Sequence, residues 1–388
     1  MPIPECALDT YNAHSRYMHT LFKAELARQT GSSITVEVDC PIACSVEMAL
    51  ESRNIVQCLV EAYLHPVHVT WDIEKYRTEC IRRQVHNGMQ KDKEVRLQKD
   101  FPSVRRNMRL VHSPRTVVDK YGRIIAWLLP GILPQRLQLL IAQCAELIAP
   151  EMGKQLRQSS HTKSWRSSEE MFTTIEGELP PGLLNFSAAW FMLGREGRID
   201  GLVSSPIVRT ECGQQWMQEF AQVGAIISGM LRIMHPDQYR MGYEVMTRLM
   251  TYPEVNDTLI SWPCIFNAAT VISSRCCPMH RDTKGSFPLF DLLISTGKYT
   301  TAPLSLLPIG VQLPNCPGSI SSFSGMGFSH GVAHAEGARV CHAFYMRQAL
   351  QVFTNVIPCS WMTQDTYKQW IGDRSRGNIT VKLDLESI

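Results

Sequence analysis

The sequence predicts an α+β protein, with short strands concentrated in the C-terminal half and helices concentrated in an N-terminal extension. Between residues 290 and 347, short apolar runs are each stopped by Gly or Pro, which is typical of strands. Further upstream, apolar residues recur at intervals of three or four, which is typical of one buried helical face: Trp216, Phe220, Val223, Ile227, Met230 and Met234. A chain of 388 residues with 44% hydrophobic residues is long enough to bury a substantial core.

The first third of the chain is expected to be mainly helical. Propensity and apolar spacing predict helices at residues 20–29, 47–63 and 72–97, and clean alternation predicts one short strand at 33–38. A hairpin should follow, with strands at 117–119 and 123–127 around the turn Lys120-Tyr121-Gly122. We therefore expect a helical, basic extension over residues 1–116, packed on a main domain over residues 117–388.

The main domain should combine helices with the later strands. Helices are predicted at residues 133–158, 216–234, 236–250 and 361–370, and the second and third should pack outside the strands. The Ser/Thr-rich stretch at 159–168 is expected to be a flexible loop, with Ser168 capping the segment after it. The strands are predicted at 290–294, 301–307, 310–313, 319–323 and 338–347.

Positive charge is unevenly distributed along the chain. Residues 82–123 contain twelve Lys or Arg and four acidic residues, whereas the whole chain has a formal net charge of only +3. A local excess of this kind is expected where a protein binds a polyanion. A solvated helix and loop would explain the same composition about equally well.

The thirteen cysteines are scattered, and no CxxC pair occurs among them. Because the start does not resemble a signal peptide, we expect an intracellular protein with reduced thiols, resident in the nucleus. The most apolar window, residues 124–148, contains Pro130, Pro134 and Arg136, so no membrane span is expected. No obligate protein partner is evident.

A candidate metal site lies in the last third of the chain. His280 and Asp282 are two positions apart and would point the same way on an extended strand, and His330 could fold back to complete the set. Two His and one carboxylate on one face of an octahedral metal leave three open positions, which suits non-haem Fe(II). His334 competes with His330 for the third ligand position.

The strand predicted at 338–347 has two different faces. One carries Arg339, Cys341, Ala343, Tyr345 and Arg347, and the other is apolar apart from His342. We expect the face with the two cations and the aromatic ring to look into the metal pocket.

Several motifs together resemble the TET/JBP family of methyl-base oxidases, in particular its fungal branch. They are Cys276-Cys277-Pro278-Met279-His280-Arg281-Asp282, Gly297-Lys298-Tyr299, Pro317-Gly318, His330-Gly331-Val332 and Arg339 to Tyr345, preceded by a hairpin at Val117 to Ile125. The resemblance covers roughly residues 117–350 and implies a double-stranded β-helix core, jelly-roll and cupin-like, with the metal core at 264–350. It also favours His330 over His334, because the nine-residue interval to Arg339 matches the family.

The resemblance implies an Fe(II)- and 2-oxoglutarate-dependent dioxygenase that uses O2, with ascorbate as a stimulant. His280, Asp282 and His330 would be the catalytic metal ligands. Arg339 would bind the distal carboxylate of 2-oxoglutarate, and Arg275 could add a second contact or be an ordinary surface residue. The partner would be double-stranded DNA with a methylated base flipped into the site and stacked on Tyr345.

Two substrate-binding positions depart from the family pattern. Gly285 stands where animal and protist members carry Asn, and Arg347 stands where they carry His; both family residues hydrogen-bond cytosine. Because Gly285 leaves room for a larger base, we expect oxidation of 5-methylcytosine with activity on N6-methyladenine as well.

Other functions fit parts of the sequence. A 2-oxoglutarate oxygenase acting on RNA, protein or a small molecule would use the same triad and the same Arg. A degenerate dioxygenase fold that only binds DNA is a further alternative, although the triad and Arg339 are intact. A zinc nucleobase deaminase is excluded, because it needs a PCxxC motif together with HxE, and PCxxC is absent.

Overall fold

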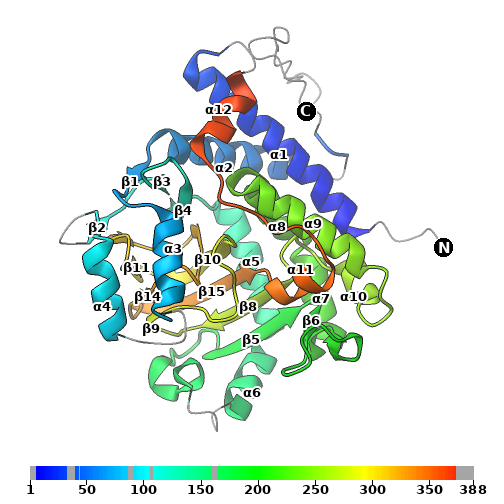
Figure 1. Ribbon diagram of the computed structural model, residues 1–388. Coiled ribbons are helices and arrows are strands. Elements are labelled where there is room, and N and C mark those ends of the chain that lie inside the picture. Colours follow the sequence, from blue (N-terminus) through cyan, green and yellow to red (C-terminus); the bar gives the residue numbers. More distant parts are fainter. Residues whose placement is uncertain are drawn as a thin grey trace.

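The computed structural model describes residues 6–32, 40–42, 44–85, 91–104, 108–159 and 164–372. Two sheets form its centre, and helices cover them on several sides (Figure 1). This arrangement is the double-stranded β-helix with flanking helices that the sequence predicts.

The larger sheet has eight strands. Their order across the sheet is β1 (Val67–His68), β3 (Arg115–Val118), β4 (Ile124–Leu129), β13 (Ser319–Phe323), β10 (Asp291–Tyr299), β15 (Gly337–Tyr345), β8 (Ala268–Ser273) and β5 (Gly182–Ser187). The predicted hairpin is present as β3 and β4, and Gly122 in its turn has a φ of 75°, a conformation that favours glycine. The four strands from β13 to β8 pair antiparallel, so the later half of the chain builds the centre of this sheet.

The smaller sheet has five short strands. Their order is β2 (Arg109–Leu110), β12 (Val311–Leu313), β11 (Leu304–Leu306), β14 (His330–Val332) and β9 (Cys277–His280). A separate pair consists of β6 (Trp190–Phe191) and β7 (Leu202–Val203). The two main sheets meet through their side chains: the rings of Phe323 on β13 and His330 on β14 lie 5.1 Å apart.

The helices are α1 (Ala7–Thr30), α2 (Val46–Leu64), α3 (Ile73–Arg82), α4 (Lys91–Asp100), α5 (Gln135–Leu147), α6 (Ala149–Ser159), α7 (Glu211–Glu219), α8 (Ala221–Met234), α9 (Pro236–Leu249), α10 (Asn256–Ser261), α11 (Gln348–Phe353) and α12 (Gln364–Gly372). In Figure 1, α1, α8 and α9 lie together on one side of the sheets, and α3 and α4 lie on the other side, near β9 and β14. None of the helices in the described ranges combines the length and the apolar character that a membrane crossing requires.

The structure divides three helices that were expected to be continuous. The one predicted at 72–97 is wrong, because α3 ends at Arg82 and α4 begins at Lys91. The one predicted at 133–158 is broken at Ile148, because Pro150 has no N–H to donate to the carbonyl four residues earlier and its ring clashes with that carbonyl. The predicted stripe from Trp216 to Met234 is buried, but Phe220 separates α7 from α8 and stacks on Trp216. The strand predicted at 33–38 lies outside the described residues.

A buried ion pair links Glu94 on helix α4 to Arg281, the residue between His280 and Asp282. The guanidinium of Arg281 donates to both carboxylate oxygens of Glu94, at 2.5 and 2.8 Å, and also to the hydroxyl of Tyr76 on α3 at 2.7 Å. Its remaining donor bonds the carbonyl of Gly327. Arg281 is 3% exposed, so these bonds replace almost all of its contact with water.

We expect Glu94→Gln to lower the free energy of unfolding by about 3 kcal/mol, because it removes one partner of a buried ion pair and leaves the other uncompensated. The matched control is Glu74→Gln on α3, whose partner Arg77 is largely exposed and whose loss should cost less than about 1 kcal/mol. Urea unfolding of both variants measures the difference. Equal midpoints for the two would contradict this role of Arg281.

Candidate active site

His280 and His330 lie opposite each other in the smaller sheet. His280 ends β9, His330 begins β14, and the two are direct partners in the antiparallel register. In each imidazole Nδ1 contacts a backbone carbonyl, that of Pro278 at 2.8 Å and that of Phe328 at 2.9 Å. Because a carbonyl only accepts, Nδ1 must donate in both rings, which leaves each Nε2 as a free lone pair.

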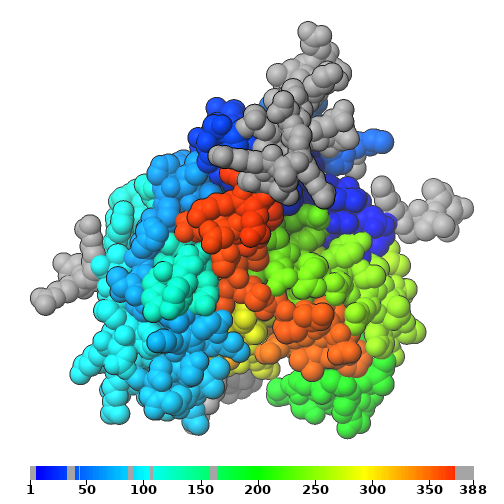
Figure 2. Space-filling view, turned by 45° about the horizontal axis from the view of Figure 1, so that its top comes forward, coloured from blue at the N-terminus to red at the C-terminus, as the bar shows by residue number. Residues whose placement is uncertain are grey.

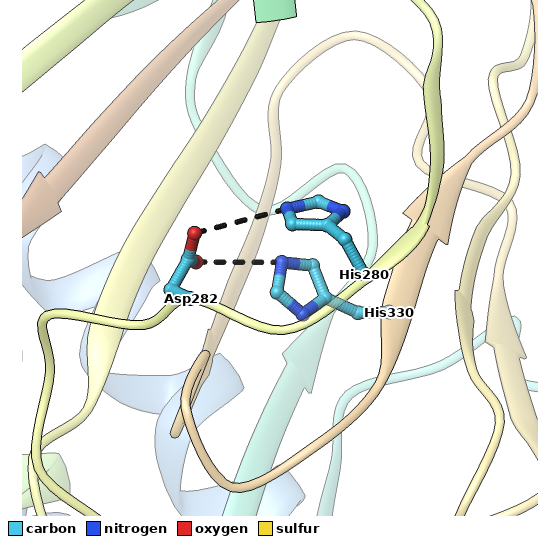
Figure 3. Close-up of side chains that lie close together, drawn as sticks. All are labelled: His280, Asp282 and His330. Carbon is cyan, nitrogen blue, oxygen red and sulfur yellow. Dashed lines mark ion pairs between the residues drawn. The ribbon is translucent and has the colours of Figure 1, made fainter. Parts of the chain in front are cut away.

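Asp282 faces both of these nitrogens (Figure 3). Its Oδ1 lies 3.8 Å from Nε2 of His280, and its Oδ2 lies 3.7 Å from Nε2 of His330. The backbone N–H of Asp282 donates to the carbonyl of Gly325 at 3.0 Å, which holds the loop after β9 against the loop before β14. Gly325 is needed there, because a Cβ on it would lie 2.7 Å from Oδ2 of Asp282.

The protonation states suit metal binding. Burial, followed by the neighbouring His330, lowers the pKa of His280 to about 3, and burial also lowers the pKa of His330. Burial alone would raise the pKa of Asp282, but the two imidazoles and the guanidinium of Arg166 lower it overall. At neutral pH the site therefore offers two neutral imidazoles and one carboxylate, which is the form that ligates a metal.

The three side chains fit an Fe(II) ion. Their ligand atoms all lie within 4.8 Å of one another, and within the described ranges they are the one such cluster of His, Cys, Asp and Glu. Carbonyl bonds to Nδ1 are the usual way in which metal-binding imidazoles are oriented. The donor set of two imidazoles and one carboxylate is that of non-haem Fe(II) oxygenases.

His334, the competing candidate, lies apart from this cluster. It is exposed, and its ring bonds the hydroxyl of Thr173 at 3.0 Å. The structure thus brings His330, and not His334, to His280 and Asp282.

Arg339 and Arg275 are two buried arginines that lie in contact with each other. Arg339 is 4% exposed and bonds the hydroxyl of Ser295 at 3.0 and 3.2 Å and the carbonyl of Arg275 at 3.5 Å. Arg275 is 9% exposed, donates to the carbonyl of Arg166 at 3.1 Å, and has a buried Nε without a partner. These partners are all uncharged, so the pair retains positive charge that a bound carboxylate would neutralise.

Tyr345 and Arg347, the two residues expected to contact the base, lie against each other. Tyr345 ends β15, and its hydroxyl lies 3.2 Å from that of Thr270 on β8. Arg347 was expected on this strand, but the strand ends at Tyr345 and Arg347 precedes α11, where its N–H bonds Asn267. Its guanidinium still lies over the Tyr345 ring, 4.6 Å from the centroid.

Gly285 has room for a side chain. A Cβ built on it would meet only the Cβ of Met326, at 3.4 Å, and its φ is not in the left-handed region. A larger side chain could therefore occupy this position without backbone strain.

Asp291, which sequence reasoning missed, lies beside the triad. It begins β10, and the same hypothetical Cβ on Gly325 that approaches Asp282 would lie 2.4 Å from Oδ2 of Asp291. Burial, and then the charge of Asp282, raises the pKa of Asp291 well above its usual range, against a smaller opposing effect of Arg347. The only signal in the sequence was an acid at the start of an apolar strand.

Trp165 and Arg166 were also missed, since they fall in the stretch expected to be a flexible loop. They form a short 3₁₀ turn, Trp165–Ser167, in which the side chain of Ser164 accepts from the N–H of Arg166. Ser168 stands at the N-cap of the next turn, Glu169–Met171, but its side chain makes no capping hydrogen bond. The Trp165 ring lies 4.7 Å from that of His280, and Arg166 donates to Oδ1 of Asp282 at 3.0 Å. A cation thus already balances the carboxylate of the triad.

A separate cavity lies away from this chemistry. It has a volume of about 850 Å³ and is lined by residues of α1, α7 and α10, among them Tyr11, Met217 and Asp257. No residue of the triad lines it.

A comparison with protein families finds one match, which spans the candidate site. Residues 208–348 match the Tet_JBP family model, described as the oxygenase domain of the 2OGFeDO superfamily. No curated protein matches the chain.

Among solved structures, one match is NgTET1 in complex with 5mC DNA, at 16% identity and a TM-score of 0.43, covering 62% of this chain and 79% of that one. Another is JOX2 in complex with 2OG, Fe and JA, at 11% identity and a TM-score of 0.24, covering 66% and 77%. The matched stretch from 208 to 348 contains His280, Asp282, His330 and Arg339, so this part of the chain is similar to the oxygenase domain of that family.

Proposed function

We propose that this protein is an Fe(II)- and 2-oxoglutarate-dependent dioxygenase that hydroxylates methyl groups on DNA bases. The observation that carries the proposal is the cluster of His280, Asp282 and His330, with neutral imidazoles and their Nε2 atoms directed at one carboxylate. It lies inside the stretch that matches the oxygenase family.

When bound, iron and 2-oxoglutarate supply the oxidation of a C–H bond by O2. His280, Asp282 and His330 would hold the ion. Arg339, with Arg275 beside it, would hold the distal carboxylate of 2-oxoglutarate, because its planar fork matches a carboxylate in two parallel bonds.

A methylated base would have to leave the duplex to reach this buried ion. Tyr345 offers a flat ring for stacking, and Arg347 and Asp291 offer polar groups for the edge of the base. Since the raised pKa of Asp291 favours its protonated form, this carboxyl can donate one hydrogen bond and accept another. Both cytosine and adenine present a ring nitrogen beside an exocyclic nitrogen, so the same pair could bind either base.

We infer two substrate bases, because a Cβ on Gly285 would meet only the Cβ of Met326, at 3.4 Å. We propose 5-methylcytosine, taken to 5-hydroxymethylcytosine and further oxidised forms, together with N6-methyladenine. On N6-methyladenine, hydroxylation gives an unstable hemiaminal whose breakdown removes the methyl group.

Asp282→Ala should abolish the reaction, because it removes one of three ligands and leaves Arg166 unbalanced beside the site. Duplexes bearing 5-methylcytosine or N6-methyladenine are incubated with Fe(II) and 2-oxoglutarate, and nucleosides are measured by mass spectrometry. Oxidised or demethylated base should form with the unaltered protein and disappear in the variant. Succinate without any change in either duplex would reject DNA as the substrate and point to RNA, protein or a small molecule.

Arg339→Met should raise the KM for 2-oxoglutarate about 30-fold or more, because truncating one partner of a buried charge pair costs about 2 to 5 kcal/mol. Arg195→Met, in a largely exposed side chain, is the control. Initial rates are measured against 2-oxoglutarate and against duplex separately. An increase confined to the KM for duplex would contradict the assignment of Arg339.

Gly285→Asn should shift the ratio of cytosine to adenine products towards cytosine, because the added amide occupies space that the larger base needs. The control is Gly153→Asn on α6, where a Cβ likewise has room. Competition between the two duplexes in one reaction measures the ratio. The pocket argument is wrong if that ratio is the same in both variants.

A further inference from the structure

Helix α4 is fixed next to the metal loop by its inward face. Glu94 bonds Arg281, the residue between the metal ligands His280 and Asp282, and Gln98 donates to the carbonyl of Leu307 at 3.1 Å. Leu97, on the same face, is 1% exposed. The orientation of α4 relative to the metal site is therefore set by buried contacts.

The other face of α4 carries unbalanced positive charge. Two of its three acids are already paired, Glu94 with Arg281 and Asp100 with Arg83, which leaves Asp92. The four cations of α4 are Lys91, Lys93, Arg96 and Lys99, and they form no ion pair with any residue in the described ranges. Lys93 is half-buried, and the other three are exposed. By contrast, Arg82, Arg83 and Arg123 from the same basic stretch of the sequence pair with acids.

Helix α4 lies next to the loop that carries two metal ligands, because Glu94 bonds Arg281 between them. In Figure 2, a yellow surface, which the colour bar assigns to the chain near residues 280 to 300, lies between blue surface on one side and orange surface on the other. The blue surface next to it has the colour of α3, and the cyan surface of α4 lies beyond α3 (Figure 1). A polyanion bound over this part of the surface would have α3 and then α4 on one of its sides.

We propose that the outward face of α4 binds the sugar-phosphate backbone of the duplex whose base enters the iron site; this rests on the proposed function. Backbone contacts by Lys and Arg fix the register of a duplex without reading its sequence. The ion pair between Glu94 and Arg281 ties that contact to the loop that carries two metal ligands. Because α4 lies outside residues 208–348, this surface is an addition to the matched oxygenase domain.

The test is the salt dependence of binding to an unmodified duplex, followed by fluorescence anisotropy. The variant replaces Lys91, Lys93, Arg96 and Lys99 with Gln. Each phosphate contact that is lost should flatten the slope of log affinity against log salt by about 0.9, so a total change of about 2 to 4 is expected. Thermal unfolding checks that the variant is folded.

The control variant removes the same charge elsewhere, by replacing Arg16, Arg28, Lys154 and Lys368 with Gln. Three of these are exposed members of ion pairs on other helices, and Arg16 is exposed on α1. Its slope should equal that of the unaltered protein. Equal flattening in both variants would overturn the proposal in favour of a general charge effect, and no flattening in the α4 variant would overturn it directly.

The same titration with an RNA duplex separates the two nucleic acids. We expect the α4 variant to lose more affinity for DNA than for RNA, and the reverse result would overturn the choice of DNA. Since anisotropy needs no turnover, failure here is distinct from failure of the proposed function, which is measured by base oxidation in the unaltered protein.

Discussion

The pairing of β14 with β9 is the constraint on which the site depends. It sets His330 directly opposite His280, so the two imidazoles lie side by side from strands that are 50 positions apart in sequence. Nδ1 of each ring bonds a carbonyl two residues earlier in its own strand or loop, which turns both Nε2 atoms to the same place. A shift of this register by one residue would send one imidazole to the other face of the sheet and remove the site.

The sequence was sufficient to predict those parts of the site that depend on local spacing. His280 ends strand β9 and Asp282 lies two residues later in the following loop, so their proximity depends on spacing alone. The hairpin at Lys120-Tyr121-Gly122 was predicted from its turn residues. The strands near Gly318 and His330 were predicted from short apolar runs, whereas their arrangement as a double-stranded β-helix was predicted only from the family resemblance. The roles of Arg339, Tyr345 and Gly285 toward ligands stay predictions.

Residues whose roles come from long-range packing could not be predicted in this way. Asp291 and Asp282 both lie against Gly325, which belongs to a third segment of the chain. They can do so because Gly325 has no side chain. Arg166 reaches Asp282 from a Ser/Thr-rich stretch that had no regular pattern, across 116 positions of sequence. Likewise, Glu94 looked like one charge in a basic helix, and only the fold shows that it is buried against Arg281. No periodicity in the sequence encodes such contacts.

The contact between Arg166 and Asp282 bears on how the ion would be loaded. Since a guanidinium already offsets the carboxylate, the described chain can fold around this site without accumulating uncompensated negative charge. Arrival of iron would then be an exchange of one cation for another, and the binding free energy would be the difference between two attractive interactions. The side chain of Arg166 is 44% exposed, so its guanidinium could move from Asp282 into water. The exchange would therefore require no opening of the core.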